Sequence, residues 1–194
     1  MAVVIIKYNA GNVQSVLYAL KRLNTEAIVT EDIALIGQAD KVIFPGVGHA
    51  AAAMQSLKEK GLDTVIKNLQ QPVLGICVGL QLMCNHSEEG DTRCLGIFDT
   101  DVKLFPAGSE KVPQIGWNTI HALRSNLMTE VPDPSYVYYV HSYYAKLCKD
   151  SIATTNHIVE YSAALQRDNF YAVQFHAEKS AVVGERIIHN FLTL

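Results

Sequence analysis

One cysteine in this chain stands in a pattern that is typical of a nucleophile. Cys77 ends a short apolar run and has a glycine two positions away on each side, Gly75 and Gly79, and helical spacing follows it. The pattern predicts a strand, a tight turn and a helix, with the cysteine on the turn. The free N–H groups at the start of such a helix favour a thiolate and can receive an oxyanion.

A cysteine nucleophile needs a base, and the base needs a group that orients it. His176 follows a predicted strand, and Glu178 lies two residues later, just before the last predicted helix. In an extended segment, side chains two residues apart point the same way, so Glu178 can accept a hydrogen bond from one ring nitrogen of His176 while the other faces Cys77. This predicts a Cys-His-Glu triad. The turn does not identify the scissile bond, so a peptidase or a glutamyl hydrolase stays open here.

The elements that must position these residues follow from the hydrophobic pattern. Apolar runs predict strands at 3–8, 27–30, 41–44 and 73–77, with helices after Asn12, a good N-cap, and at 50–60. This alternation predicts βαβ units around a mostly parallel sheet flanked by helices. The second half is richer in strands, predicted at 101–105, 117–121, 136–144, 152–155, 161–165 and 170–175, before a last helix near Ser180. We expect one α/β domain over residues 1–194.

Composition narrows the function further. The formal net charge is −3 without a basic tract, so neither nucleic acid nor a membrane is expected as a partner. No apolar run approaches the roughly 20 residues of a membrane-spanning helix. Cys84, Cys94 and Cys148 lack a glycine frame and no C-x-x-C pair occurs, so we expect packing residues in a reduced, cytoplasmic chain. The histidines are scattered, and no metal site is expected.

Two motifs together resemble a known family. The stretch G-I-C-V-G-L-Q around Cys77 and the later Q-F-H-A-E-K-S resemble the triad (class I) glutamine amidotransferases. Within that family, the chain is most similar to the glutaminase subunits of imidazole glycerol phosphate synthase, of histidine biosynthesis. Segments 8–12, 45–48, 111–118 and 138–143 support this narrower resemblance, and they occur in the expected order across nearly the whole chain.

The resemblance implies hydrolysis of glutamine to glutamate and ammonia through a thioester on Cys77, with no cofactor. The tetrahedral intermediate needs N–H donors. One is expected from Val78, next after the nucleophile, and the resemblance places the other in the Gly46-Val47-Gly48 loop, at the Val47 N–H. It also implies that Gln81 and the backbone around Ser142 and Tyr143 hold the amino-acid end of glutamine.

The product ammonia predicts a partner. In water at neutral pH ammonia is protonated and stops being a nucleophile, which favours direct delivery to a synthase. The resemblance implies a heterodimer with a cyclase subunit that has a (β/α)₈ barrel and makes imidazole glycerol phosphate and an aminoimidazole carboxamide ribonucleotide. Asn12, Trp117, Tyr138 and Lys179 match family positions at or near that interface.

Two positions depart from the family pattern. Ala177 stands where the family usually has proline, and Gln114 stands where it usually has histidine. Alanine can adopt the φ that proline imposes, so Ala177 predicts a looser unfolded state rather than a lost triad. The role of the side chain at position 114 is open.

Two other functions on the same fold stay open. The first is the glutaminase subunit of a different synthase, against which the Gly-Trp-Asn segment and Lys179 weigh. The second is a catalytically silent regulatory subunit, which only Ala177 and Gln114 favour. The intact triad together with Gln81 weighs against it.

Overall fold

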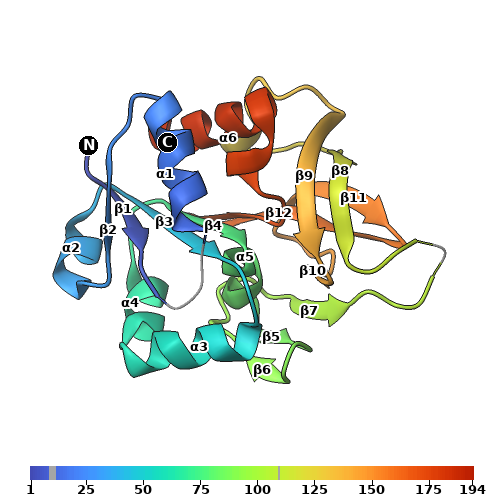
Figure 1. Cartoon of the computed structure of the whole chain (residues 1–194), viewed down its shortest axis with the longest axis horizontal. Coiled ribbons are helices and arrows are strands. Elements are labelled where there is room, and N and C mark those ends of the chain that lie inside the picture. Colours follow the sequence, from blue (N-terminus) through green and yellow to red (C-terminus); the bar gives the residue numbers. More distant parts are fainter. Residues whose placement is uncertain (9–11, 109) are drawn as a thin grey trace.

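The computed structural model describes residues 1–8, 12–108 and 110–194 of the chain. Its centre is a sheet of seven strands in the order β11-β12-β13-β4-β3-β1-β2 (Figure 1). These are β1 (Val3–Ile6), β2 (Ala27–Thr30), β3 (Lys41–Gly46), β4 (Val73–Cys77), β11 (Ser151–His157), β12 (Val159–Arg167) and β13 (Phe170–Val173). The strands from β13 to β2 pair in parallel, and β12 pairs antiparallel with both β11 and β13. The predicted mostly parallel α/β architecture is confirmed.

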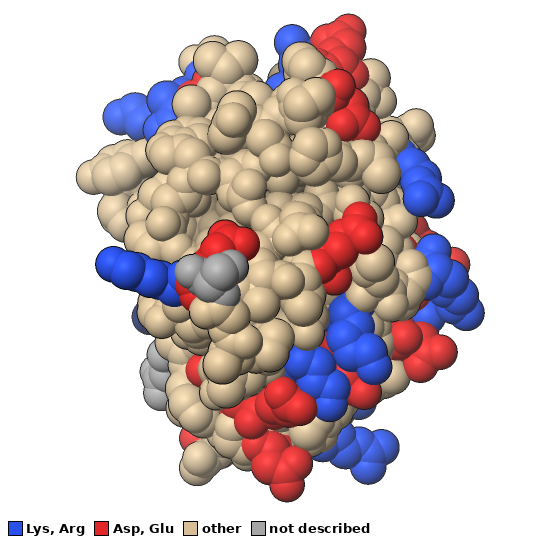
Figure 2. Space-filling model, turned by 90° about the vertical axis from the view of Figure 1, so that its right-hand side faces the viewer, with Lys and Arg blue, Asp and Glu red and all other residues tan. Residues whose placement is uncertain are grey.

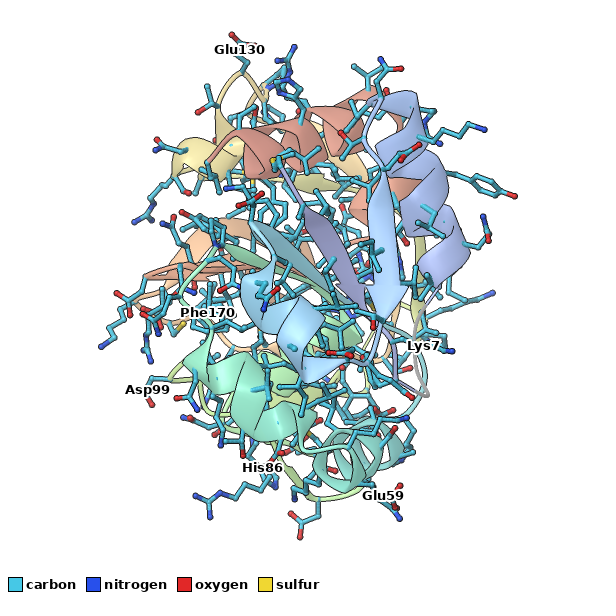
Figure 3. The ribbon with its side chains drawn as sticks, turned by 90° about the vertical axis from the view of Figure 1, so that its left-hand side faces the viewer. Lys7, Glu59, His86, Asp99, Glu130 and Phe170 are labelled. Atoms are coloured by element: carbon cyan, nitrogen blue, oxygen red, sulfur yellow. The ribbon has the colours of Figure 1, made fainter. Side chains whose placement is uncertain are left out.

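Helices cover both faces of this sheet. One face carries α1 (Val13–Arg22) and α6 (Ala181–Thr193), and the other carries α3 (Ala50–Glu59), α4 (Leu62–Asn68) and α5 (Val78–Met83) (Figures 1 and 3). The short α2 (Ile33–Gln38) follows β2. Strands β1, β3 and β4 are buried along their whole length, as expected of strands with helices on both faces. The Asn12 side chain accepts from Ser15 N at 3.3 Å, which confirms the predicted cap of α1.

Two smaller sheets extend the strand-rich second half. A four-stranded sheet in the order β10-β7-β5-β6 contains β5 (His86–Ser87), β6 (Thr92–Arg93), β7 (Asp101–Leu104) and β10 (Tyr143–Ala145). A hairpin pairs β8 (Gln114–Ile120) with β9 (Ser135–His141). The hairpin lies beside β11 and β12 at one end of the molecule (Figure 1).

The single strand predicted at 136–144 is wrong, because the chain forms two strands there. β9 ends at His141, β10 begins at Tyr143, and the two belong to different sheets. Between them, the Ser142 carbonyl accepts from Phe105 N at 3.0 Å. Both halves are rich in strand-forming aromatic residues, so the composition does not reveal the change of partner.

Other differences are smaller. Helices α2 and α4 were not predicted, because elements of six and seven residues give little periodic signal. The strand predicted from 117 begins at Gln114, and the strand predicted over 170–175 ends at Val173. In the segment 8–12, residues 9–11 lie outside the described residues.

Candidate active site

Cys77 lies on a strained turn at the carboxyl end of a central strand. It ends β4 and precedes α5, with φ 54° and ψ −109°, a conformation that non-glycine residues rarely adopt. Gly46 of β3 pairs with Cys77, and β13 pairs with β4 on the other side. The side chain is 3% exposed. The predicted strand, turn and helix are therefore present, and the turn presents the sulfur at the edge where the parallel strands end.

Glycines allow the backbone of β3 to approach this turn. A methyl carbon at Gly79 would lie 2.0 Å from the Phe44 carbonyl oxygen, and one at Gly46 would lie 2.8 Å from Gly79 N. Both contacts are with backbone atoms, so larger residues would push β3 and the turn apart. The close packing brings the loop after β3 against Cys77.

His176 and Glu178 form a buried pair. The distance from His176 Nδ1 to Glu178 Oε1 is 2.7 Å, and each side chain is 2% exposed. Glu178 lies in a 3-10 turn, Ala177–Lys179, rather than in an extended segment. The expected contact is present, but the geometric reason given for it from the sequence is wrong: the turn, not strand alternation, brings the carboxylate back to the ring.

Hydrogen bonds from β9 and the last turn hold the histidine segment. The His176 N–H donates to the Tyr138 carbonyl at 2.9 Å. The Ser180 hydroxyl donates to the His176 carbonyl at 2.7 Å and accepts from Tyr138 N at 2.9 Å. The main chain at His176 is thus tied to the hairpin β8–β9.

The surroundings of His176 favour its protonated form. Burial lowers the pKa of the imidazole, but the interactions with Cys77 and Glu178 outweigh burial and raise the pKa to about 10. Nδ1 faces Glu178, and the buried Nε2 has no hydrogen-bond partner of good geometry among the described residues. Nε2 is the nitrogen left to act toward the sulfur.

Ala177, where the family usually has proline, is the first residue of the 3-10 turn. Proline is tolerated at this position, because its missing N–H has no partner inside the turn. We predict that Ala177→Pro raises the free energy of unfolding by less than about 1 kcal/mol, mainly through the unfolded state, and leaves turnover little changed. Denaturant unfolding and glutamate release measure the two effects.

An exposed residue in the interior of α3 gives the opposite control for that prediction. Gln55→Pro removes a backbone N–H inside the helix and is expected to lower stability by about 3 kcal/mol or more. A large rise in turnover for Ala177→Pro would contradict the prediction, because it would mean that the triad is misaligned in the natural chain.

A cavity of about 400 Å³ opens at Cys77. Its lining comes from the turn, from the loop after β3 and from the ends of β9 and β10: Val47, Gly48, Cys77, Val78, Gln81, Glu89, Pro113, Val140, His141, Ser142, Tyr143 and His176. Most of the predicted catalytic, loop and substrate residues are therefore together. Gly46 and Glu178 lie close to lining residues in the chain but do not line the cavity themselves. None of the four predicted interface residues lines it.

The loop expected to supply an oxyanion donor borders the cavity. Val47 and Gly48 line it, and Gly48 has φ 98°, which favours glycine. Val78 is the first residue of α5 and also lines the cavity. The structure thus brings both expected donor residues to the nucleophile.

The predicted substrate residues are already bonded to one another. Gln81 is buried, and its Nε2 donates to the Tyr143 carbonyl at 2.8 Å. That carbonyl also accepts from His141 Nδ1 at 2.8 Å, and the Ser142 carbonyl is occupied by Phe105 N. These two carbonyls therefore hold the cavity wall, and these bonds leave the side-chain oxygen of Gln81 for a ligand.

Glu89 is a cavity residue that sequence reasoning missed. It lies in the turn between β5 and β6, and its carboxylate accepts from Ala50 N, at the start of α3, at 2.7 Å. No local pattern marks it, because an acidic residue in an exposed turn is ordinary. Only the packing of that turn against α3 brings its negative charge to the cavity.

Gln114, the second departure from the family pattern, does not line the cavity. It is buried, and its Oε1 accepts from the Tyr161 hydroxyl at 2.7 Å. The same hydroxyl lies 3.1 Å from His141 Nε2. Burial lowers the pKa of His141 to about 3, so this ring is neutral. Gln114 therefore supports the cavity wall from behind, through Tyr161 and His141.

Two of the four expected interface residues, Trp117 and Tyr138, lie opposite each other on the hairpin of β8 and β9. Trp117 is 54% exposed and packs edge-on against Tyr138, with ring centroids 6.0 Å apart. Exposed apolar neighbours on β8 and β9 are Ile115, Tyr136 and Val140. Figure 2 shows this side of the molecule, where a broad area has no charged side chains. Lys179 follows Glu178 in the 3-10 turn, and Asn12 caps α1.

Comparison of the sequence with known proteins assigns the chain to a family. The family model described as "Glutamine amidotransferase class-I" matches residues 4–194. The chain belongs to the class I glutamine amidotransferases. Among relatives of this amidotransferase is the imidazole glycerol phosphate synthase subunit HisH of Bacteroides fragilis, 59% identical over 196 residues that cover 100% of both chains. The same-named subunit of Yersinia pseudotuberculosis is 42% identical, again over 100% of both.

Solved structures support the same fold. The crystal structure of a glutamine amidotransferase aligns with a TM-score of 0.74 at 15% identity, covering 100% of this amidotransferase and 98% of the other chain. A glutamine amidotransferase from Thermotoga maritima aligns with a TM-score of 0.65 at 18% identity, covering 100% and 83%. At these identities the likeness concerns the fold alone.

Within the described part of the chain, no group of three or more His, Cys, Asp or Glu is arranged to hold a metal ion. No described helix has the length and apolar character needed to cross a bilayer. The four cysteines are free thiols.

Proposed function

We propose that this chain is the glutaminase subunit of an imidazole glycerol phosphate synthase, formed by one amidotransferase domain over residues 1–194. It hydrolyses glutamine to glutamate and ammonia and delivers the ammonia to a cyclase subunit. The observation that supports this best is the convergence of Cys77, His176 and Glu178 at one cavity, in a chain that is 59% identical over its full length to a HisH subunit. The free thiols fit a reduced, cytoplasmic setting.

The catalytic steps follow from the triad. The sulfur of Cys77 attacks the side-chain carboxamide carbon of glutamine, and His176 gives a proton to the departing ammonia, which leaves a glutamyl thioester. His176 then takes a proton from water, which attacks the thioester and frees glutamate. Glu178 accepts from Nδ1 at 2.7 Å, so it keeps Nε2 directed toward the sulfur and stabilises the imidazolium.

The tetrahedral intermediates carry an oxyanion that needs donors. The Val78 N–H at the start of α5 supplies one, and the Gly46-Val47-Gly48 loop supplies the other through Val47. The peptide between Gly46 and Gly48 has the freedom to turn its N–H toward or away from the cavity. Loss of one such donor typically costs about 10²–10³ in rate.

The amino-acid end of glutamine carries one positive and one negative group. The N–H groups around Ser142 and Tyr143 hold the carboxylate end, whereas Glu89 and the side-chain oxygen of Gln81 accept from the ammonium group. Two observations support this role for Glu89. Its carboxylate belongs to the cavity lining, and Oε2 accepts from Ala50 N, which leaves Oε1 for the ammonium group.

We predict that Glu89→Gln raises the KM for glutamine by about tenfold or more, because a hydrogen bond to a charged group is worth roughly 1.5–3 kcal/mol. The amide oxygen still accepts from Ala50 N, so the cap of α3 and the turnover number should change less. Glu88→Gln is the matched control: its carboxylate accepts from Leu104 N and pairs with Lys103, outside the cavity. An unchanged KM in Glu89→Gln would remove Glu89 from the substrate site.

The partner surface is the outer face of β8 and β9. Val140 lines the cavity and pairs with Ile115, and Trp117 pairs with Tyr138 along the same apolar face. An exposed apolar face beside the cavity mouth suits a stable partner that must receive ammonia without releasing it to water. We propose a heterodimer with a (β/α)₈-barrel cyclase on this face, with Asn12 and Lys179 near its edge.

The test is the steady-state release of glutamate by the lone chain, by its complex with the cyclase subunit, and by the complex with the cyclase's nucleotide ligand. We expect the lone chain to be nearly silent and the liganded complex to be fastest. In the lone chain the Val47 N–H would point away from the cavity, and the loss of this donor costs about 2.7–4 kcal/mol of transition-state stabilisation. Binding of the liganded partner would turn the loop so that the N–H faces the cavity, which is the loop switch under test. Equal rates in all three samples would exclude the loop switch, and no glutamate in any of them would exclude the function.

A further inference from the structure

Gln174 is a buried polar side chain beside the nucleophile that the steps above do not use. It lies between β13 and His176 and is 0% exposed, and its backbone N–H donates to the Ala163 carbonyl at 2.8 Å. Burying a primary amide costs free energy unless its N–H groups and its oxygen find partners. Its partners therefore indicate its role.

The two ends of the Gln174 amide contact two different cavity residues. Nε2 lies 3.8 Å from Cys77 Sγ, within donor distance of a sulfur, and Oε1 accepts from Gln81 Nε2 at 3.2 Å. Cys77 and Gln81 line the cavity, whereas Gln174 does not. It joins the nucleophile to the proposed substrate residue from behind the cavity wall.

The orientation of the Gln174 amide follows from the Tyr143 carbonyl, which can only accept hydrogen bonds. The Tyr143 carbonyl accepts from Gln81 Nε2 and from His141 Nδ1, each at 2.8 Å. This contact fixes the NH₂ group of Gln81 on the side that also faces Gln174, so the Gln174 atom opposite it must be the oxygen. The NH₂ group of Gln174 then faces the sulfur.

We propose that Gln174 is a positioning residue that directs an N–H donor at Cys77 Sγ and holds Gln81 in its substrate-binding orientation. This inference rests on the proposed function, because it gives Gln174 a role at the same site. A sulfur that attacks as a thiolate can only accept hydrogen bonds. An N–H directed at it therefore stabilises its negative charge and holds the sulfur in position. Gln174 acts through Cys77 and Gln81.

Two substitutions of similar length separate the two contacts. Gln174→Glu keeps an oxygen for Gln81 but has no N–H for the sulfur, and Gln174→Met has neither. Gln166→Glu is the matched control, because Gln166 lies on β12 and its Nε2 donates to the Tyr171 hydroxyl at 3.3 Å, away from the cavity. For each full-length chain, the rate of Cys77 alkylation by iodoacetamide is measured, and kcat and KM for glutamine are measured in the complex with the cyclase subunit.

We expect alkylation and kcat to fall about tenfold in both Gln174 variants, the size of one lost hydrogen bond to a charged group. KM should stay close to the natural value in Gln174→Glu and rise in Gln174→Met, where Gln81 Nε2 loses one of its two acceptors. Gln166→Glu should match the natural chain in every measurement. This split between kcat and KM would not arise from a merely structural role.

Circular dichroism gives the folded fraction of each variant, and rates are compared per folded molecule. If Gln174→Glu has the same alkylation rate and the same kcat per folded molecule as the natural chain, the proposal is overturned. Loss of activity only in proportion to the folded fraction would overturn it as well. If the natural chain releases no glutamate in its complex, the proposed function fails, whereas the alkylation rates still decide the role of Gln174.

Discussion

Replacing Cys77 with alanine is expected to lower glutamate release by at least about 10⁴-fold while the chain stays folded. The sulfur ends β4 on the strained turn and lines the cavity together with His176. No other described cysteine lines that cavity, so no second thiol can take its place. Alanine has the same difficulty with a φ of 54° as cysteine, so the strain of the turn is unchanged and a folded, inactive chain is the expected product.

Cys84→Ser is the matched control for this prediction. Cys84 lies just after α5, is fully buried, and its Sγ donates to the Leu80 carbonyl at 3.4 Å, a bond that a serine hydroxyl can keep. Burial raises the pKa of this thiol well above its usual range, so it stays protonated and is not a nucleophile. Turnover close to the natural rate is expected. Substantial glutaminase activity in purified Cys77→Ala would exclude Cys77 as the nucleophile.

Gly184→Ala is expected to disable the site from a position outside the cavity. Gly184 is a buried residue of α6, and a methyl carbon there would lie 1.9 Å from the Ala177 carbonyl oxygen and 2.8 Å from its carbonyl carbon. Carbon–oxygen contacts normally start at about 3.3 Å, so either α6 or the 3-10 turn must move by more than 1 Å. Ala177 is the residue between His176 and Glu178, so the pair moves with it.

A misplacement of about 1 Å can cost 10²-fold in rate, so we expect turnover to fall by about that factor, or the chain to lose stability as α6 is displaced. Thermal unfolding and kcat in the complex measure both. Gly37→Ala is the control, because Gly37 lies in α2 with no heavy atom within 4 Å of the added carbon. It should keep full turnover and gain up to about 1 kcal/mol in stability. Natural turnover and stability in Gly184→Ala would contradict the packing described here.

The local pattern of residues determined the parts of the fold that depend on near neighbours. The strands over 27–30 and 73–77, the cap at Asn12 and the turn at Cys77 were all predictable. Each depends on apolar periodicity, a capping side chain or glycine spacing, and these act within a few residues. The order of the parallel strands then brings Cys77, at the end of β4, beside His176, which follows β13.

Other features were decided only by tertiary structure. Glu89 reaches the cavity because the turn between β5 and β6 packs on α3, and the break at Ser142 occurs because two sheets compete for one segment. Gln174 and Gln81 are 93 residues apart in the sequence, yet one amide orients the other. A buried amide, carboxylate or carbonyl must find a partner wherever packing places one. The residue types alone show which groups need partners, but only the folded chain shows which partners they have.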